Sequence, residues 1–355
     1  MARLTRVQQQ ARTRAAVLAA AAREFVEHGY ADAKVDRIAE RAELTRGAVY
    51  SNFPGKRSLY LAVLLEIARN RPSAASPAPP ADVAAAAEAF ARTWLERLPL
   101  TGDTAAGARL RGHSVTGVFD DEPGRAAMAG LAQLESLLLA LRLESSRPRE
   151  ARRVRLAELI LTLLHGADHL AQSAPGFGDP FDVTRACRYL AAMEAPDRWD
   201  PPHLPYIPAA RPGRQAWAPP AEMTDALTDG PVGCAGDGVV VILGAARLGM
   251  AEEAVRAARP GEPVTIAAVT STPAEIGALV RLRITDLAGS LRRVFGPAGT
   301  AVRLILDEEG LLAAAAGVDA ADDTEAAVRI GDGEIVARAD GRGAGHAAAI
   351  ATGER

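Results

Sequence analysis

Two proline-rich stretches divide this chain into three parts. Residues 72–80 hold four prolines, and residues 196–231 hold nine of the chain's 23. Proline fixes φ and removes a backbone donor, so neither stretch can continue a helix. The first is typical of a stiff extended spacer, and the second, which lacks an apolar period, of a long linker or wrapping arm. The expected parts are therefore 1–71, 81–195 and 232–355.

The hydrophobic pattern changes between these parts. In 1–71 and 81–195 apolar residues recur at helical spacing, which predicts helices throughout. In 232–355 short apolar runs alternate with helical segments, which predicts an α/β layer fold. The predicted strands are Val239–Leu243, Val264–Val269 and Val302–Leu306. We therefore expect a multidomain protein with an all-α head and body followed by an α/β domain.

The formal net charge of −3 hides an asymmetry. Residues 1–71 carry 13 Lys and Arg against 7 Asp and Glu, a net charge of +6. A basic head on an acidic body suggests that the head meets a polyanion.

No apolar run approaches the roughly 18 residues of a membrane span, and the N-terminus lacks a secretory apolar core, so we expect a cytoplasmic protein without a membrane partner. Two cysteines, Cys187 and Cys234, are too few for a disulfide scaffold or a cysteine-based zinc site.

Two short helices in the head, Val35–Ala42 and Thr45–Asn52, are separated by a tight turn. This arrangement predicts a helix-turn-helix whose second helix enters the major groove of DNA. Ala39 supplies the small residue needed where the helices touch, and Thr45 is a good N-cap. Three apolar residues are expected to pin the pair to the preceding helix: Ile38, Leu44 and Val49.

Three motifs in the head carry a family resemblance. They are Phe25-Val-Glu-His-Gly-Tyr30, Val35-Asp-Arg-Ile-Ala39 and Leu44-Thr-Arg-Gly-Ala-Val-Tyr-Ser-Asn-Phe-Pro-Gly-Lys56, followed by Leu59. Together they resemble the DNA-binding head of TetR-type repressors. The resemblance implies a three-helix head, a helical ligand-binding and dimerisation body, and a homodimer on a palindromic DNA operator. It also implies that a small-molecule effector releases the DNA.

The resemblance assigns DNA-contacting roles to seven residues. Thr45, Tyr50 and Lys56 match positions that meet phosphates. Arg46, Gly47 and Ser51 match positions that face base edges, and Asn52 lies near the backbone or a base. Arg46 has the geometry to read guanine with two hydrogen bonds.

Two positions depart from the family pattern. Glu43 stands where a turn glycine is usual, at a cost of about 1 kcal/mol if the backbone there is left-handed. Ala33 and Lys34 replace the usual threonine cap of the first short helix.

In the body, the resemblance places the dimer contact on helices near 150–172 and 180–194, and the ligand cavity between the earlier helices. Its candidate lining residues are Phe90, Trp94, Arg109, His113, Phe119 and His165. His165 and His169 share one helical face, which with His113 is a possible metal set; the alternative is that these histidines lie in the pocket or at the dimer contact. Arg109 and Arg111 either attract an anionic ligand or face solvent. We assign no metal and no cofactor.

Two segments of the last part, Leu306–Gly310 and Ile330–Val336, resemble the thioredoxin and peroxiredoxin scaffold. Where that scaffold places its redox cysteines, Leu243–Ala251 contains no thiol. Because the nucleophile must be a thiolate, we expect 232–355 to be a thioredoxin-like, non-catalytic appendage. Cys234 remains either a lone sensor or a small buried thiol.

These observations predict a ligand-responsive homodimeric repressor that is not an enzyme. The alternative is a thiol-dependent oxidoreductase or redox sensor acting through 232–355. On the first interpretation, an isolated fragment 1–195 should retain some DNA binding.

Overall fold

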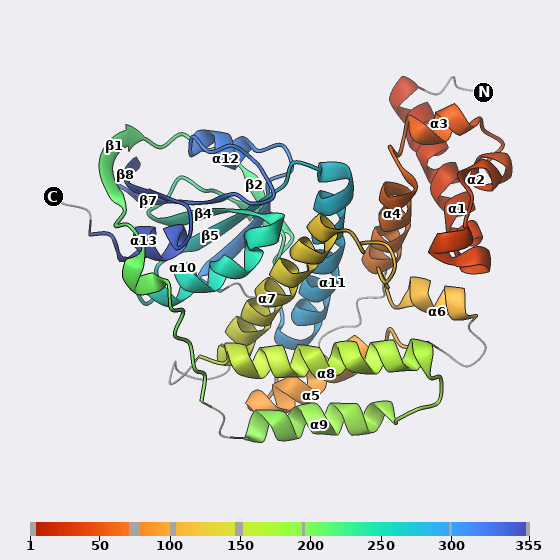
Figure 1. Cartoon of the computed structure of the whole chain (residues 1–355), viewed down its shortest axis with the longest axis horizontal. Helices are drawn as coiled ribbons and strands as arrows, with labels where there is room; N and C mark the ends of the chain where they lie inside the picture. Colours follow the sequence, from red (N-terminus) through yellow and green to blue (C-terminus); the bar gives the residue numbers. More distant parts are fainter. Residues whose placement is uncertain are drawn as a thin grey trace.

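The computed structural model describes residues 5–70, 79–99, 104–145, 152–193, 196–297 and 300–352. These residues form a helical N-terminal region and a C-terminal region built on one mixed sheet, at opposite sides of Figure 1. Most of the proline-rich spacer predicted at 72–80 lies outside the described residues.

The head consists of four helices: α1 (Arg6–Asp32), α2 (Val35–Arg41), α3 (Arg46–Tyr50) and α4 (Lys56–Arg69). Gly29 interrupts α1 with a φ of 71°. Phe25 is buried, whereas Val26 is 37% exposed. Val26 lies against the start of α6, where its carbonyl accepts a hydrogen bond from Thr104 Oγ1 at 3.5 Å, and not in the core of the head.

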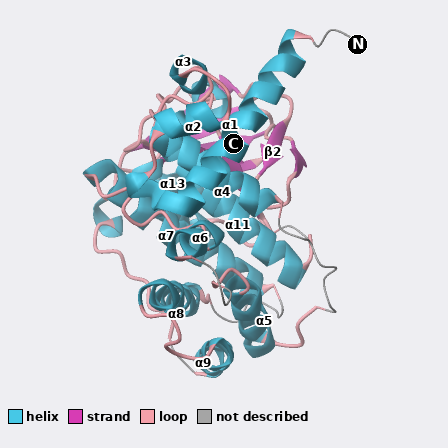
Figure 2. Ribbon diagram, turned by 90° about the vertical axis from the view of Figure 1, so that its right-hand side faces the viewer, coloured by secondary structure: helices cyan, strands magenta, loops and turns pink. Residues whose placement is uncertain are grey.

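Five helices form the body: α5 (Val83–Leu95), α6 (Ala105–Arg111), α7 (Glu122–Glu144), α8 (Val154–Ser173) and α9 (Pro180–Ala192). Side chains of Asp82, Thr104 and Asp121 cap the first three of these helices. Helix α5 packs against α8 and α9, which lie together at one end of the molecule (Figure 2). By length and composition α7 could span a membrane, but 67% of its apolar window is buried in the protein, as in a core helix.

Eight strands form the sheet in the order β1-β8-β7-β4-β5-β6-β2-β3. Strands β4, β5 and β6 run parallel, and β7 is antiparallel to β4. The three strands predicted from apolar runs are β4, β5 and β6. The bounds are β1 (Arg211–Ala216), β2 (Met223–Asp225), β3 (Gly230–Val232), β4 (Gly238–Gly244), β5 (Val264–Val269), β6 (Val302–Leu306), β7 (Glu325–Gly331) and β8 (Glu334–Asp340).

The segment 196–231 is an arm that reaches both edges of the sheet. After a 3-10 turn η1 (Leu204–Tyr206), β1 pairs with β8 at one edge, and β2 and β3 extend the other edge beyond β6. Pro212 and Pro231 lie in these edge strands, where a missing donor is tolerated. The described part of this segment is therefore built into the sheet and is not a plain linker beside it.

Three short helices and one turn cover the sheet. Helices α10 (Ala251–Ala257) and α13 (Ala344–Ile350) pack together on one face, and α12 (Leu311–Ala315) packs on the other. The 3-10 turn η2 (Ala245–Met250) follows β4.

Helix α11 (Ala278–Phe295) departs from the predicted domain organisation. It begins after a π turn η3 (Pro273–Gly277), leaves the sheet between β5 and β6, and packs against α4, α5 and α7 (Figure 1). Its buried residues belong to one apolar core shared with the head and body: Leu279, Leu282, Ile284, Leu287 and Leu291. The C-terminal region is thus not a separable appendage.

The turn η2 makes a second close contact with the body. A Cβ at Gly130 of α7 would lie 2.8 Å from the carbonyl oxygen of Ala245, and one at Gly249 would lie 1.7 Å from Gln133 Oε1. The first contact is with backbone and needs a residue without a side chain, whereas at the second the Gln133 side chain would have to move. The loop that would carry the cysteines of a thioredoxin-like protein is therefore packed on α7.

Candidate nucleic-acid interface

The turn between α2 and α3 has the geometry of a helix-turn-helix. Glu43 has a φ of +55°, the left-handed conformation anticipated for this position. Thr45 Oγ1 accepts a hydrogen bond from the Ala48 amide at 3.2 Å, so the predicted N-cap is present. Ile38, Ala39 and Val49 are buried, which fixes α3 against α1 and α2.

We expect Glu43→Gly to raise the free energy of unfolding by about 1 kcal/mol, because glycine adopts a positive φ without a Cβ clash. The greater unfolded-state entropy of glycine offsets part of that gain. Urea unfolding measures the change. The matched control is Glu40→Gly inside α2, which should instead destabilise the protein by about 1 kcal/mol. Equal losses for both variants would contradict the strain at Glu43.

A buried glutamate replaces the missing threonine cap of α2. Glu24 of α1 is fully buried, and its Oε1 accepts hydrogen bonds from the Lys34 amide at 3.0 Å and from Arg37 Nε at 2.6 Å. Burial acts to raise the pKa of Glu24, but these hydrogen bonds outweigh it and leave the pKa below its usual value. The sequence pattern does not reveal this role because donor and acceptor lie on different helices.

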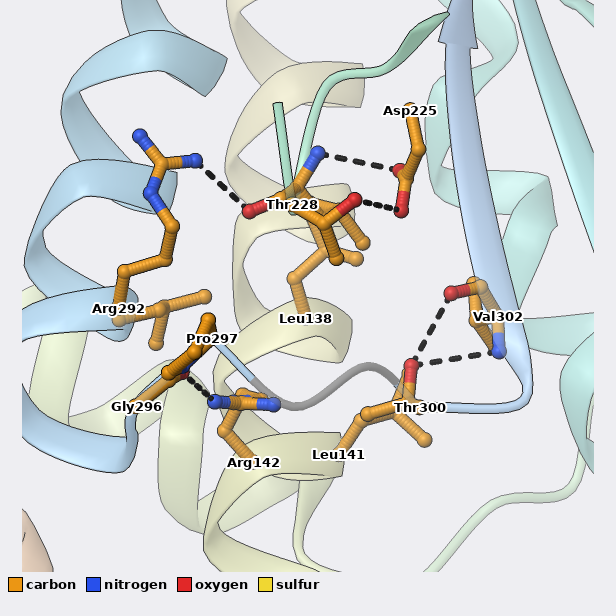
Figure 3. A pocket seen from close by; sticks show the side chains of 12 residues that line it. Leu138, Leu141, Arg142, Asp225, Thr228, Arg292, Gly296, Pro297, Thr300 and Val302 are labelled. Atoms are coloured by element: carbon orange, nitrogen blue, oxygen red, sulfur yellow. Dashed lines mark hydrogen bonds between the residues drawn. The ribbon is translucent and has the colours of Figure 1, made fainter. Parts of the chain in front are cut away.

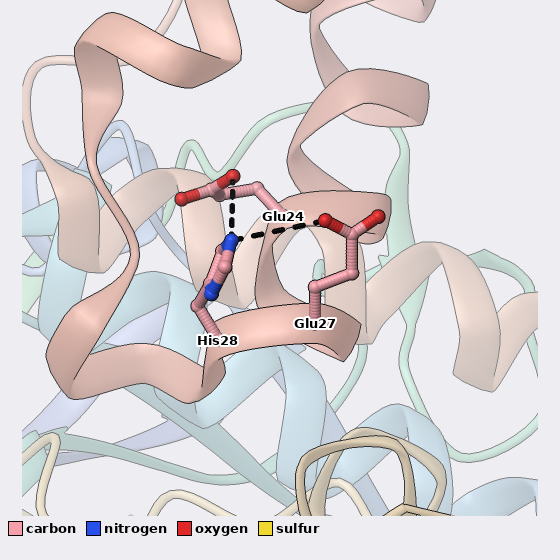
Figure 4. A group of neighbouring side chains, drawn as sticks. All are labelled: Glu24, Glu27 and His28. Atoms are coloured by element: carbon pink, nitrogen blue, oxygen red, sulfur yellow. Dashed lines mark ion pairs between the residues drawn. The ribbon is translucent and has the colours of Figure 1, made fainter.

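Glu24, Glu27 and His28 form a group whose ligand atoms lie close enough to hold a metal ion (Figure 4). His28 Nε2 lies 3.8 Å from Glu24 and 3.7 Å from Glu27. Arg37 already pairs with Glu24, and Arg41 with both Glu24 and Glu27, so the group is an ion-pair network. The three histidines considered from the sequence are not brought together: in the described residues His113 faces Asp286 and His165 faces Arg283, while His169 is exposed.

Five of the seven predicted DNA-contacting residues are exposed on one end of the head: Thr45, Arg46, Gly47, Tyr50 and Ser51. The Arg46 side chain is 61% exposed. Its Nη1 lies 3.2 Å from Asp36 Oδ1, and its guanidinium carbon lies 5.4 Å from the centre of the Tyr50 ring. These weak contacts leave Arg46 able to turn towards a base edge.

The other two predicted residues are half-buried and already bonded. Asn52 Nδ2 donates to the Ala48 carbonyl at 2.9 Å. Lys56 Nζ donates to the carbonyls of Ala31 and Ala33 at 3.0 and 3.1 Å, and burial lowers the pKa of Lys56. Lys56 therefore ties the end of α1 to the start of α4, whatever else it contacts.

Arg14 is a further cation that the motif does not single out. It is exposed on α1, its guanidinium carbon lies 4.3 Å from the centre of the Phe53 ring, and its Nη1 donates to the Asn52 carbonyl at 3.4 Å. A cation is thereby held beside the end of α3. The sequence signal that could have pointed to Arg14 is the net positive charge of residues 1–71. That charge comes from many residues and does not single out Arg14.

The residues expected to line a ligand cavity separate into two groups. Phe90, Trp94 and His165 lie together, with Trp94 and His165 ring centres 5.1 Å apart. Phe119 lies instead under Arg57 at the start of α4, and Arg109 is exposed. Burial, together with nearby Arg283 and Arg97, lowers the pKa of His165 to about 3, so this ring is neutral.

Two ion pairs from α11 occupy the middle of the body. Asp286 lies 2.5 Å from Arg97 Nη1, with both side chains buried. Arg283 donates two hydrogen bonds to Glu135, at 2.8 and 2.5 Å, and its Nη2 lies 3.1 Å from His165. Of the polar residues expected to meet an effector, His113 and His165 therefore meet α11 instead.

A small cavity lies between α7, α11 and the β2 edge of the sheet (Figure 3). Arg142 donates to the Gly296 carbonyl at 2.6 Å, and Arg292 donates to the Leu227 carbonyl at 2.8 Å. The cavity has a volume of about 30 Å³, which is far below that of a pocket for a drug-sized molecule. A larger, open hollow of about 1120 Å³ near Arg214 and Arg259 lies at the amino end of β4.

Neither cysteine is activated. Both are buried; burial raises the pKa of Cys187 to about 12 and also raises that of Cys234. A redox sensor needs an accessible thiolate, so the oxidoreductase alternative is not favoured.

Comparisons with known proteins bear on the head. Residues 17–63 match the family model for bacterial regulatory proteins of the tetR family. The HTH-type transcriptional regulator SrpR of Pseudomonas putida is 48% identical over 52 residues, which are 15% of this chain and 24% of SrpR. The uncharacterized HTH-type transcriptional regulator TtgW, also of Pseudomonas putida, is 48% identical over 52 residues, or 39% of its length. The match thus spans only about a quarter to two fifths of these relatives.

Two solved structures are also similar. NalD, the secondary repressor of the MexAB-OprM multidrug efflux pump in Pseudomonas aeruginosa, is 18% identical, covering 54% of this chain and 99% of NalD with a TM-score of 0.36. The fatty acid degradation regulator FadR from Bacillus halodurans is 18% identical, covering 50% of this chain and 93% of FadR with a TM-score of 0.27.

Residues 17–63 are a helix-turn-helix DNA-binding domain, and this domain is of the TetR family.

Proposed function

We propose that the chain is a cytoplasmic, homodimeric transcriptional repressor that binds a palindromic operator through α3. The observation that carries the proposal is the exposed Arg46–Tyr50 face of a Thr45-capped helix inside the family-matched segment. Exposed cations at Arg46 and Arg14 supply the charge that such binding needs. The seven residues named from the resemblance are its proposed DNA contacts, with Lys56 also holding the head together.

The proposed dimer contact lies on α8 and α9. Large apolar side chains gather there in an exposed position: Leu159, Leu170, Phe177, Phe181, Tyr189 and Met193. A second copy of the chain that packed on these two helices would cover their exposed apolar side chains.

The proposed effector is a small molecule of unassigned identity that binds in the body near Phe90, Trp94, His113 and His165. The sheet region is proposed to be a thioredoxin-like scaffold without catalysis, supported by the lack of a thiol after β4.

Selection of bound duplexes from random DNA tests the function. We expect enriched palindromes, two chains per duplex and an affinity that falls steeply with salt. Arg46→Ala should relax preference at one base position by about 1–3 kcal/mol. The matched control is Arg214→Ala on the exposed edge strand β1, which removes the same charge far from the head and should change nothing. No enrichment, or binding indifferent to salt, would refute the repressor.

A further inference from the structure

Arg57 lies where the head, the body and the C-terminal region meet. It is the second residue of α4, shortly after α3 ends. Its Nη2 donates to Asp121 Oδ2 of the body at 2.8 Å, and its Nη1 donates to Glu275 Oε2 at 3.1 Å. The guanidinium carbon lies 4.8 Å from the centre of the Phe119 ring.

Glu275 belongs to η3, the turn that leads directly into α11. A Cβ at Gly55, in the loop between α3 and α4, would lie 3.4 Å from Glu275 Oε1, so this carboxylate packs on the loop that carries the recognition helix. Both η3 and α11 contact α4. The head therefore receives its support at this point from the C-terminal region.

The segment before η3 is anchored in the sheet region. Ser271 Oγ donates to Asp322 Oδ2 at 3.0 Å, and Thr270 Oγ1 donates to Asp322 Oδ1 at 2.5 Å. Asp322 lies in the loop that leads into β7. At its other side, α11 is fixed in the body by the Arg97–Asp286 and Arg283–Glu135 pairs. A displacement of the sheet region must therefore move Glu275 or break these contacts.

We propose that the C-terminal sheet region is a second regulatory input of the protein, besides the effector site proposed in the body, and that it acts on operator affinity through the Glu275–Arg57 contact at the start of α4. The inference rests on the proposed DNA-binding function and adds the route by which that function is controlled. Two sites are coupled when both bias the same structural element, which here is α4. With the contact intact, α3 is held in the placement that fits the operator.

A double-mutant cycle in the full-length protein tests this route. The readout is the ratio of the dissociation constants for the selected operator and for a random-sequence duplex, which cancels the effect of removing a charge near DNA. Glu275→Ala should reduce operator preference roughly 5- to 10-fold, and should have no effect in the Arg57→Gln background. The matched control is Glu96→Ala, which removes an ion pair between α11 and α5 at Arg293 and should leave preference unchanged.

The outcomes separate the two proposals. If the unmodified protein does not bind DNA, the repressor proposal fails. If it binds but Glu275→Ala leaves operator preference unchanged, raises it, or reduces it equally with and without Arg57, the proposed route is wrong. Urea unfolding of each variant ensures that a loss of preference is not a loss of folding.

Discussion

A chain ending at residue 195 is expected not to fold. The truncation removes α11, whose buried leucines and isoleucine are part of the core shared with α4, α5 and α7. At about 1.5–3 kcal/mol for each of the five buried side chains, the loss is on the order of 10 kcal/mol. That is comparable with the roughly 5–15 kcal/mol by which whole proteins are stable. The expectation from the sequence that the fragment 1–195 retains DNA binding is replaced by this one.

Buried charges add to the effect. Without α11, Arg97 loses Asp286 and Glu135 loses Arg283. Circular dichroism and amide proton dispersion of the fragment measure the outcome, and co-expression of 196–355 as a separate chain is the control that should restore a folded complex. A cooperative unfolding transition in the isolated fragment would contradict the shared core.

The sequence predicted those features that depend on local patterns. The Thr45 cap, the buried Val49 and the buried strand Val239–Leu243 each follow from residues within one turn or one strand. Likewise, the positive φ of Glu43 follows from its place in the motif.

Features that depend on distant partners were not predictable in this way. Helix α11 has the spacing of an ordinary helix between two strands, and nothing local indicates that Asp286 meets Arg97, 189 residues away. Strand β1 is exposed along its whole length, so it has no apolar alternation to recognise. The sequence motif assigns Lys56 a phosphate contact. It does not reveal that Lys56 also donates hydrogen bonds to the carbonyls of Ala31 and Ala33, because backbone acceptors leave no pattern in the sequence.

Glu135→Ala is expected to destabilise the protein by about 3–5 kcal/mol, because it leaves the largely buried guanidinium of Arg283 without its partner. The nearby carboxylates of Asp286 and Asp168, which also act on Arg283, can compensate only in part. His165 is neutral, since its pKa lies at about 3, and Asp286 is already paired with Arg97 at 2.5 Å. Thermal and urea unfolding measure the change.

Two controls distinguish the unpaired charge from a simple loss of packing. Replacing both partners, as Glu135→Leu with Arg283→Met, removes the charges together and should cost far less than Glu135→Ala alone. Glu96→Ala breaks a pair whose carboxylate is 49% exposed and should cost less than about 1 kcal/mol. If the double replacement is as damaging as Glu135→Ala, packing and not charge holds α11 in the body. If the double replacement restores stability, the unpaired buried charge of Arg283 accounts for the destabilisation by Glu135→Ala. Helix α11 is then held in the body by an ion pair to which the C-terminal region supplies Arg283 and the body supplies Glu135.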